Sequence, residues 1–321
     1  MTRNIIFKSL YKIGLARFLR NSKSEYITVL NLHRITEERD EFYNPILPKT
    51  FYRILEYCCR HYEIISFGSI EEPTLKPKLI LSFDDGYYDF IEYVLPHLKK
   101  LGLPCNHNVV NFCINENEPI WTHRLNEIFK TFKKSNNFSD EILIEITKNE
   151  KQLNIAYFKV FKYLLGINKI QRDKILDLWS TKYEVKLKSR MMSWDDIIYC
   201  SNNGVEIGSH TYYHSSLKNE VNEDILKLEI FDSIQEISSI INKEINILAL
   251  PNGQYNDSVL DYANACKIKY VLFSDDQINS ISNVSKNNNK ISRIGLSDVS
   301  PFENILKIEL FHSKLKSLLG Q

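Results

Sequence analysis

Two pairs of residues in this sequence have the types and the spacing that hydrolytic chemistry needs. Asp84 and Asp85 are adjacent carboxylates at the end of the apolar run 79–83. Two carboxylates this close resist joint ionisation unless they share a cation or a proton. His210 and His214 are four residues apart, a spacing that on a helical turn places both imidazoles on one side. With one carboxylate they make a two-histidine, one-carboxylate set, a common open site for zinc or another divalent ion.

Each pair also has a purely structural interpretation. Aspartate is a good N-cap, and the segment 87–101 after the two aspartates has a helical pattern. Two histidines at this spacing also occur on the surface of an ordinary helix. A third polar cluster, Pro251-Asn252-Gly253, again follows an apolar run directly. Because α/β barrels and open sheets build their sites at the carboxyl ends of strands, the three clusters together favour one shared site.

The elements that must position these clusters alternate between strand and helix. The first part of the chain follows the order β-α-β-α-β, which is typical of a parallel sheet or barrel with helices outside, so we expect an α/β fold. The expected strands are 26–34, 63–67, 79–83, 105–112, 204–208, 247–250, 270–273 and 290–294. The expected helices of this α/β part are 48–61, 87–101, 193–202, 223–242, 258–266 and 301–319.

Between about residues 113 and 190 this alternation stops. Apolar residues recur there at helical spacing, in stretches such as 125–132 and 155–165, without strand alternation. A separate small helical domain would have the same pattern. We favour a helical insertion in the α/β domain, because the alternation of strand and helix resumes after it.

Residues 1–24 form a distinct segment ahead of the main domain, residues 25–321. They contain six basic and no acidic residues, and their apolar residues recur at helical spacing, which predicts a basic amphipathic helix. The segment has no uninterrupted apolar core or small-residue cleavage site, so we do not expect a signal peptide, and it is too charged to span a membrane. Two hypotheses remain: the helix lies on an anionic membrane face, or it packs on its own domain.

The composition is that of an ordinary globular protein. Of the 321 residues, 43% are hydrophobic and 25% charged, and the formal net charge is +1, so no global field favours binding to a nucleic acid polymer. The six cysteines include no CxxC pair, which predicts reduced thiols rather than disulfides or a cysteine zinc site. Together with the lack of a signal peptide, this indicates a cytoplasmic protein, with the N-terminal helix as a contact to the inner membrane face.

The polar clusters resemble the motifs of a known family. Phe83-Asp84-Asp85-Gly86 and His210-Thr211-Tyr212-Tyr213-His214 are similar to the first two motifs of the NodB-homology polysaccharide deacetylases, carbohydrate esterase family 4. The strand Leu30-Asn31-Leu32-His33-Arg34-Ile35 resembles one near the start of many members. The resemblance covers about 26–112 and 190–300. It implies a distorted, incomplete (β/α) barrel and metal-dependent removal of an acyl group, usually N-acetyl from an amino sugar.

The resemblance also implies roles for individual residues. Asp85, His210 and His214 would bind the metal, with Zn²⁺ as first candidate and Co²⁺, Ni²⁺ or Fe²⁺ as alternatives. Asp84 would be the general base on the metal-bound water that attacks the amide. The cluster of Pro251, Asn252 and Gly253 corresponds to the third motif and would contact substrate.

Three departures from the family pattern indicate a subclass. The arginine that usually opens the third motif is Ala249 here, the fourth motif has no counterpart, and the final strand 291–296 lacks the usual general-acid histidine. His33 could protonate the leaving amine instead, although a structural histidine bonded to backbone is an equal interpretation. Arg293 could orient Asp84, and the alternative is a surface salt bridge.

We therefore expect a sugar N-deacetylase of surface-polysaccharide or lipopolysaccharide biosynthesis. A cytoplasmic enzyme would meet an N-acetylated sugar or oligosaccharide linked to a lipid or a nucleotide rather than a finished polymer. One alternative is a deformylase or amidase acting on a lipid-linked sugar or a small amide, with the same metal and water chemistry. The other is a non-catalytic sugar-binding scaffold, against which the retention of both aspartates and both histidines argues.

Overall fold

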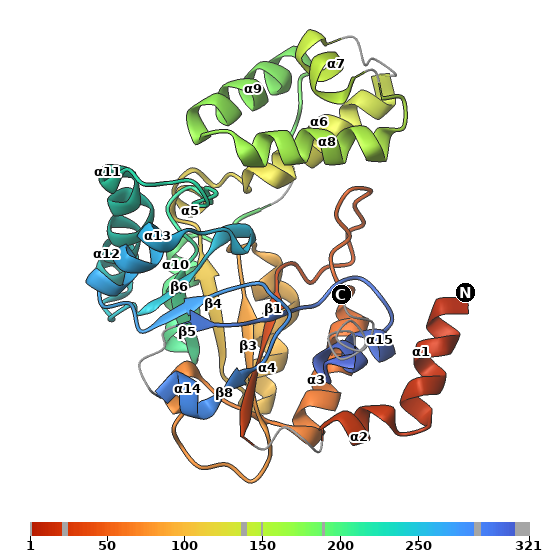
Figure 1. Cartoon of the computed structure of the whole chain (residues 1–321), viewed down its shortest axis with the longest axis vertical. Helices are drawn as coiled ribbons and strands as arrows, with labels where there is room; N and C mark the ends of the chain where they lie inside the picture. The colour runs from red at the N-terminus through yellow and green to blue at the C-terminus, as the bar shows by residue number, and fades with distance from the viewer. Residues whose placement is uncertain are drawn as a thin grey trace.

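Strands from both halves of the chain form one sheet in the computed structural model, which describes residues 2–20, 25–135, 140–148, 150–187, 190–285 and 290–311. The strand order is β10-β1-β3-β4-β5-β6-β7-β9, and the neighbours along it are parallel. The strands at its two ends, β9 and β10, follow each other directly in the chain. The sheet therefore curls into a nearly closed barrel, which confirms the expected distorted (β/α) barrel (Figure 1).

The strands on this path are β1 (Tyr26–Leu32), β3 (Lys78–Phe83), β4 (Cys105–Val109), β5 (Val205–Ser209), β6 (Ile247–Ala249), β7 (Tyr270–Leu272), β9 (Lys290–Ile291) and β10 (Ile294–Gly295). Two further short strands lie off it, β2 (Glu63–Ile64) beside β3 and β8 (Asn279–Ser280) antiparallel to β1. The central strands are covered on both faces, which is why they are almost continuously apolar.

Helices surround the barrel wall (Figure 1). Those of the α/β part are α3 (Pro48–His61), α4 (Leu95–Leu101), α5 (Asn111–Glu116), α10 (Trp194–Asn202), α11 (Glu223–Leu226), α12 (Ser233–Ile241), α13 (Asp257–Ala265), α14 (Ile281–Ser285) and α15 (Pro301–Ile308). Two of them continue π-helices, η2 (Phe90–Val94) before α4 and η3 (Lys227–Asp232) between α11 and α12. Short 3₁₀ turns occupy η1 (Phe67–Ser69) and η4 (Pro251–Gly253).

Four helices between β4 and β5 form a separate layer over the barrel (Figure 1). They are α6 (Trp121–Ser135), α7 (Glu141–Thr147), α8 (Leu153–Gly166) and α9 (Lys169–Lys182). They pack around a hydrophobic core of their own that includes Phe129, Phe132 and Trp179. Asp140 connects α7 to α9. It caps α7 and also accepts hydrogen bonds from the Trp179 indole at 3.0 Å and from Lys182 at 2.8 Å. We call this layer, residues 121–182, the insertion helices.

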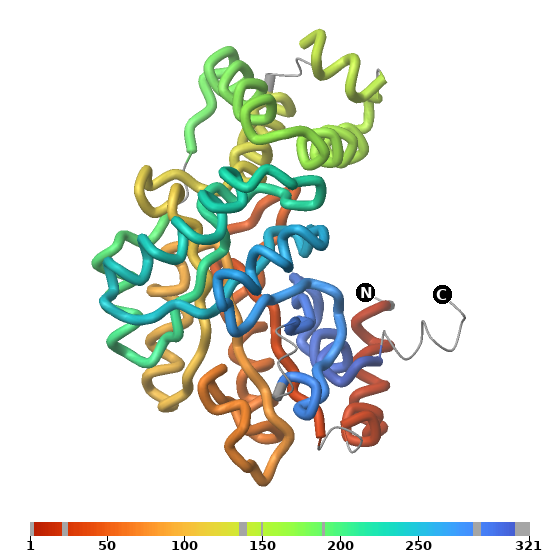
Figure 2. Tube along the Cα trace, turned by 60° about the vertical axis from the view of Figure 1, so that its left-hand side comes forward, coloured from red at the N-terminus to blue at the C-terminus, as the bar shows by residue number. Residues whose placement is uncertain are grey.

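The N-terminal segment forms two helices rather than the single one expected, α1 (Thr2–Lys12) and α2 (Leu15–Arg20). The chain breaks at Gly14, whose φ of 87° is open to glycine but costly for other residues. Both helices contact α15. They lie beside the barrel and away from the insertion helices (Figures 1 and 2). Residues 21–24 of the expected helix lie outside the described residues.

Three expected elements end or begin elsewhere for local reasons. The helix expected over 87–101 becomes helical only near Phe90, because Asp85 and Gly86 take φ values of 80° and 88° and turn the chain sharply after β3. The strand expected over 105–112 ends at Val109, and α5 follows. The closing helix ends at Ile308, and residues 312–321 lie outside the described part.

The strand expected over 290–294 is also two strands, and the break has a consequence for the site. β9 pairs with β7 and β10 pairs with β1, so the chain crosses the gap in the barrel between them. Ser292 and Arg293 occupy this crossing. Arg293 therefore belongs to neither strand. Its side chain is fully buried inside the barrel.

Two sequence-level expectations concern the whole chain. All six cysteines are free. Among the described helices, none combines the length and the apolar character that a membrane crossing requires.

Candidate active site

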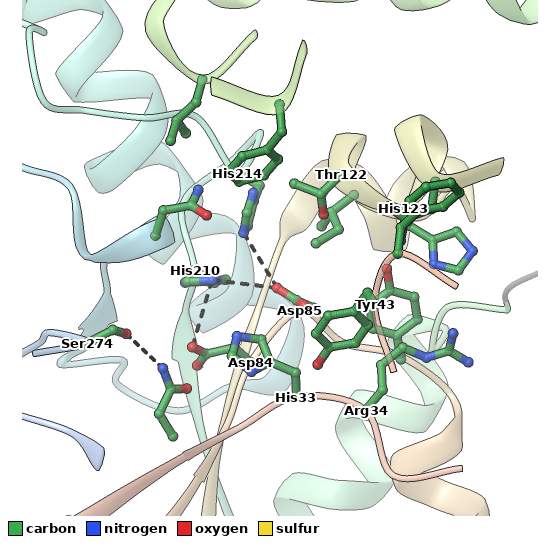
Figure 3. Close-up of a pocket in the computed structure, with 18 of the residues that line it drawn as sticks. His33, Arg34, Tyr43, Asp84, Asp85, Thr122, His123, His210, His214 and Ser274 are labelled. Atoms are coloured by element: carbon green, nitrogen blue, oxygen red, sulfur yellow. Dashed lines mark hydrogen bonds and ion pairs between the residues drawn. The ribbon is translucent and has the colours of Figure 1, made fainter. Parts of the chain in front are cut away.

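Parallel pairing brings the predicted polar clusters to one end of the barrel. Leu32 at the end of β1 pairs with Phe83 at the end of β3, so His33 and Asp84 leave the sheet side by side. His210 follows β5, and Asn252 follows β6. These residues line one cavity of about 520 Å³ (Figure 3). The site therefore lies at the carboxyl ends of the strands, where α/β folds build their sites.

Asp85, His210 and His214 form a buried cluster with the donor set of a metal site. One ligand atom from each lies within 4.8 Å of the others. The Nε2 atoms of both histidines are 3.6 Å from Asp85 Oδ1 (Figure 3). Three lone-pair atoms converge on one point, so a divalent cation fits there.

The histidines do not reach this point from a helical turn, as their spacing suggested. Residues 210–214 form an irregular loop in which Thr211 and His214 have φ values of 65° and 55°. Glu229 of η3 is buried beneath the loop and accepts a hydrogen bond from the Tyr213 N–H at 2.9 Å. Its backbone carbonyl accepts from the Tyr212 N–H at 3.2 Å. The strained loop is therefore held in place from below.

The protonation of the two histidines suits metal binding. His210 Nδ1 lies 2.8 Å from the Ala249 carbonyl oxygen, which can only accept, so Nδ1 carries the proton and Nε2 keeps its lone pair. Burial lowers the pKa of His214 well below its usual value, so its ring is neutral as well. Burial and the neighbouring Asp84 raise the pKa of Asp85, whose Oδ1 has no hydrogen-bond donor among the described residues. A cation at this point would satisfy that oxygen.

Asp84 is held as a carboxylate by Arg293. The guanidinium donates from its two terminal nitrogens to Asp84 Oδ1 and Oδ2, both at 2.8 Å. Burial acts to raise the pKa of Asp84, but the charge and hydrogen bonds of Arg293, together with the neighbouring imidazoles of His210 and His33, outweigh it and hold the pKa well below its usual range. His210 Nε2 is 3.8 Å from the carboxylate, which therefore borders the metal cluster. Arg293 is fully buried, so the alternative of a surface salt bridge is excluded.

The two aspartates are not helix caps. Asp84 donates its backbone N–H to the Leu32 carbonyl at 2.9 Å, and its side chain points into the barrel. The next helical segment begins near Phe90, well beyond both aspartates.

Polar residues of β4 form a layer beneath Asp84 that sequence reasoning missed. Asn108 donates to Asp84 Oδ1 at 2.7 Å, and Ser82 donates to Asn106 at 2.7 Å. Gly208 of β5 makes room for this layer, because a Cβ there would lie 2.2 Å from Asn108 Oδ1. The available signal was the pair of asparagines that flank His107 in a strand whose positions are all buried.

The remaining predicted residues differ in where they lie. His33 lines the cavity beside Asp84 (Figure 3), and burial lowers its pKa to about 4. In the third cluster only Asn252 lines the cavity, with φ of 55°, whereas Pro251 is buried and Gly253 packs against Ser274.

Other lining residues were not among the predicted site residues. Asn31 and Ser274 line the cavity on the barrel side and are joined by a 2.7 Å hydrogen bond. The opposite wall comes mainly from the insertion helices and the 33–46 loop. Its residues include Tyr43, Thr122, His123, Asn126, Tyr157, Phe158, Phe161 and Leu165. Only the tertiary packing of α6 and α8 over the barrel brings these side chains to the site.

Several solved structures share this fold, among them those of two deacetylases. A Streptococcus pyogenes deacetylase, PplD in complex with acetate, is 18% identical with a TM-score of 0.58, over 88% of this chain and 98% of that one. A de-N-acetylase from Aggregatibacter actinomycetemcomitans is 18% identical with a TM-score of 0.54, over 87% and 99%. IcaB from Ammonifex degensii is 12% identical with a TM-score of 0.58, over 90% and 97%.

A comparison with curated proteins found no match. The sequence model of one family, described as polysaccharide deacetylase, matches residues 71–271. This range is more than half of the chain and contains Asp84, Asp85, His210 and His214. The resemblance expected from the motifs is thereby confirmed, and the chain belongs to the polysaccharide deacetylase family.

Proposed function

We propose that this protein is a metal-dependent hydrolase that removes the N-acetyl group from an amino sugar. The observation that carries the proposal is the buried cluster of Asp85, His210 and His214 with the Arg293-bound carboxylate of Asp84 at its edge. A pure sugar-binding scaffold has no use for a base beside a metal. The S. pyogenes structure, which is similar in fold, is a deacetylase in complex with acetate, the acid that this reaction would release.

The donor set suits a divalent cation, held by Asp85 Oδ1 and the Nε2 atoms of His210 and His214. Zn²⁺ is the first candidate, and Co²⁺, Ni²⁺ or Fe²⁺ would accept the same donors. When bound, such an ion supplies Lewis acidity to the amide carbonyl and lowers the pKa of water. The chain's own residues must then move the protons.

Asp84 is placed to accept the proton of the attacking water. Because Arg293 holds its pKa well below the usual range, Asp84 is ionised at neutral pH and available as a general base. Arg293 occupies both carboxylate oxygens from one side, which fixes the plane of the carboxylate. We assign Arg293 as a positioning residue that supplies the charge missing at Ala249.

His33 is placed to deliver a proton to the leaving amine. With its pKa lowered to about 4, the ring is neutral at pH 7 and must first accept the proton that Asp84 took from water. It then donates to the amide nitrogen as the C–N bond breaks, which releases acetate and the free amine. The proton count balances, since water supplies one oxygen and one hydrogen to acetic acid, which then ionises to acetate, and its other proton to the nitrogen.

The cavity walls support a sugar joined to an apolar group. On the barrel side, Asn31, Asn252 and Ser274 offer the hydrogen bonds that sugar hydroxyls need. On α8, Phe158, Phe161 and Leu165 offer none, and Phe158 is 59% exposed although it lines the cavity. The nearby Arg34 is already paired with Asp89 at 2.7 Å, which makes it a poor site for a nucleotide diphosphate. A lipid-linked sugar of surface-polysaccharide or lipopolysaccharide biosynthesis fits best.

The test is release of acetate from N-acetylated sugars by the purified protein, loaded with zinc or cobalt. Asp84→Asn should abolish release, while the matched exposed variant Asp195→Asn should retain it. Formate release from N-formyl sugars without acetate release would replace the proposal by the deformylase alternative. A protein that binds the metal and the sugar but releases neither acid would be a scaffold.

A further inference from the structure

The N-terminal helices present large apolar side chains to solvent although their other side is already packed. Ile5 and Ile6 of α1 are 56% and 52% exposed, Ile13 in the turn is 77% exposed and Phe18 of α2 is 76% exposed. Single exposed apolar residues are ordinary, but four within two adjacent short helices need an explanation. We call these residues the outer face.

The orientation of the outer face is fixed by the side opposite to it. Phe7, Ala16 and Leu19 are buried against the domain. The Tyr11 ring contacts the Phe302 ring at 5.3 Å, and Arg3 donates to the Glu303 carboxylate with its Nε at 3.0 Å. Because the inner side is satisfied by α15, the four outer side chains are not an unfinished core.

Basic residues alternate with these apolar ones on the same surface. Ile5, Lys8 and Lys12 follow each other at helical spacings of three and four, so they share one side of α1. Arg17 precedes Phe18 on α2 and is exposed. Residues 2–20 contain no carboxylate side chain. Within the described part of the chain, no ion pair involves Lys8, Lys12 or Arg17, so their charges face solvent.

A basic cavity adjoins this surface and extends it. About 400 Å³ in volume, it lies between α1, α3 and α15. Its lining includes four cationic or titratable basic groups, Lys8, Arg53, Arg60 and His61, against one carboxylate, Glu56. Lys8 lines this cavity and lies three residues after Ile5 of the outer face on α1. Arg60 is already paired with Glu56, so a phosphate-sized anion at the surface would meet Lys8 and Arg53 of this lining.

We propose that the outer face and the basic cavity form a docking surface for an anionic lipid membrane. Apolar side chains enter the boundary between headgroups and acyl chains, and lysine or arginine side chains lie at the depth of the lipid phosphates. A membrane would therefore account for both the exposed apolar side chains and the basic ones. A purely polyanionic partner would leave four exposed apolar side chains unexplained, and a symmetric dimer would bring Lys8, Lys12 and Arg17 of two copies against each other.

The proposal is independent of the catalytic one, although the two are compatible. The N-terminal helices lie beside the barrel, and the insertion helices stand at another end of the molecule (Figures 1 and 2). Docking would therefore leave the cavity at the strand ends uncovered. A membrane-docked enzyme would meet a lipid-linked substrate at its own surface.

The test is sedimentation of the full-length protein with phosphatidylcholine vesicles, with and without about one-third phosphatidylglycerol. We expect binding to the anionic vesicles at low salt and its loss at about 0.5 M salt. The charge variant Lys8→Gln/Lys12→Gln/Arg17→Gln should bind on the order of a hundredfold more weakly, since each cation near an anionic surface contributes about fivefold. The apolar variant Ile6→Ser/Ile13→Ser/Phe18→Ser should bind at least about tenfold more weakly.

A matched control substitutes exposed apolar residues elsewhere, Leu75→Ser/Ile170→Ser, which are 104% and 80% exposed. This variant should bind like the wild type. Because every substituted side chain is exposed, all variants should keep the wild-type melting temperature. No vesicle binding, equal binding to neutral vesicles, or unchanged binding of both triple variants would overturn the proposal. A change in oligomeric state in the apolar variant, without vesicle binding by the wild type, would identify a subunit interface instead.

Discussion

Replacing Arg293 by methionine should destabilise the protein by leaving Asp84 as an unpaired buried charge. Arg293 makes two hydrogen bonds to the carboxylate at 2.8 Å and donates to Ser82 and to the Phe273 carbonyl, both at 3.2 Å. Breaking a buried ion pair by removing one partner costs about 3–5 kcal/mol. We expect a loss of this size in the free energy of unfolding at pH 8.

The loss should depend on Asp84 and on pH. In an Asp84→Asn background Arg293 is itself the unpaired buried charge, so Arg293→Met removes that charge and should cost little or even stabilise the protein. In the wild type the lowered pKa of Asp84 means that its stabilising contribution is present above the pKa of the unfolded chain and lost as the pH falls. In Arg293→Met, burial raises that pKa, so the penalty grows as the pH rises. The difference between the two proteins should therefore shrink between pH 8 and pH 4.

The assay is urea denaturation, monitored by tryptophan fluorescence. A metal chelator is present, so that no bound metal ion contributes to the stability of the site. Wild type, Arg293→Met, Asp84→Asn and the double variant form a double-mutant cycle. Arg60→Met, at an exposed helical position, is the control and should change stability by no more than about 0.5 kcal/mol. A loss below about 1 kcal/mol at pH 8, or an equal loss in the Asp84→Asn background, would refute the role given to this ion pair.

Three further predictions concern the metal cluster, the layer beneath Asp84 and the insertion helices. By elemental analysis, the wild type and the control Asp195→Asn should bind about one divalent ion per chain, and Asp85→Asn should bind none. A wild-type protein that contains no metal after incubation with zinc would contradict the assignment. Gly208→Ala should lower turnover and cost about 1–3 kcal/mol in chemical denaturation, because its Cβ would displace Asn108 Oδ1, whereas Gly166→Ala has open space and should be neutral. Asp140→Ala should destabilise the insertion helices by about 1–2 kcal/mol through the lost N-cap, measurable as faster proteolysis of that segment. Burial acts to raise the pKa of Asp140 but its donors lower it, so this stabilisation is full at neutral pH and should disappear only as strong acid protonates the carboxylate.

Much of the fold was predictable because its signals are local. The strand before Asp84-Asp85-Gly86, the pairing of His210 with His214 and the alternation of strand and helix could all be predicted from short stretches of sequence. Parallel pairing then places the ends of those strands together by a general rule of α/β proteins. The local rules failed where the backbone departs from regular geometry, as at the turn after β3 and in the loop of the two histidines.

The support of Asp84 could not be assigned from sequence, since Arg293 is more than two hundred residues from it in the chain. Nothing local distinguishes a buried guanidinium from one in a surface salt bridge. The difference arises because the last strand breaks in two at the closure of the barrel and turns Arg293 inward. The same holds for Asn108, whose partner lies on the neighbouring strand.

By itself the sequence determined the family motifs, the four residues at the centre of the site and the α/β character of the chain, because each depends on residue types at short spacing. Only the tertiary structure decided which residue holds Asp84, which side chains wall the cavity and which face of the N-terminal helices is left to solvent. Those features depend on contacts between distant segments, and such contacts form only when the hydrophobic faces of helices and sheet are buried together.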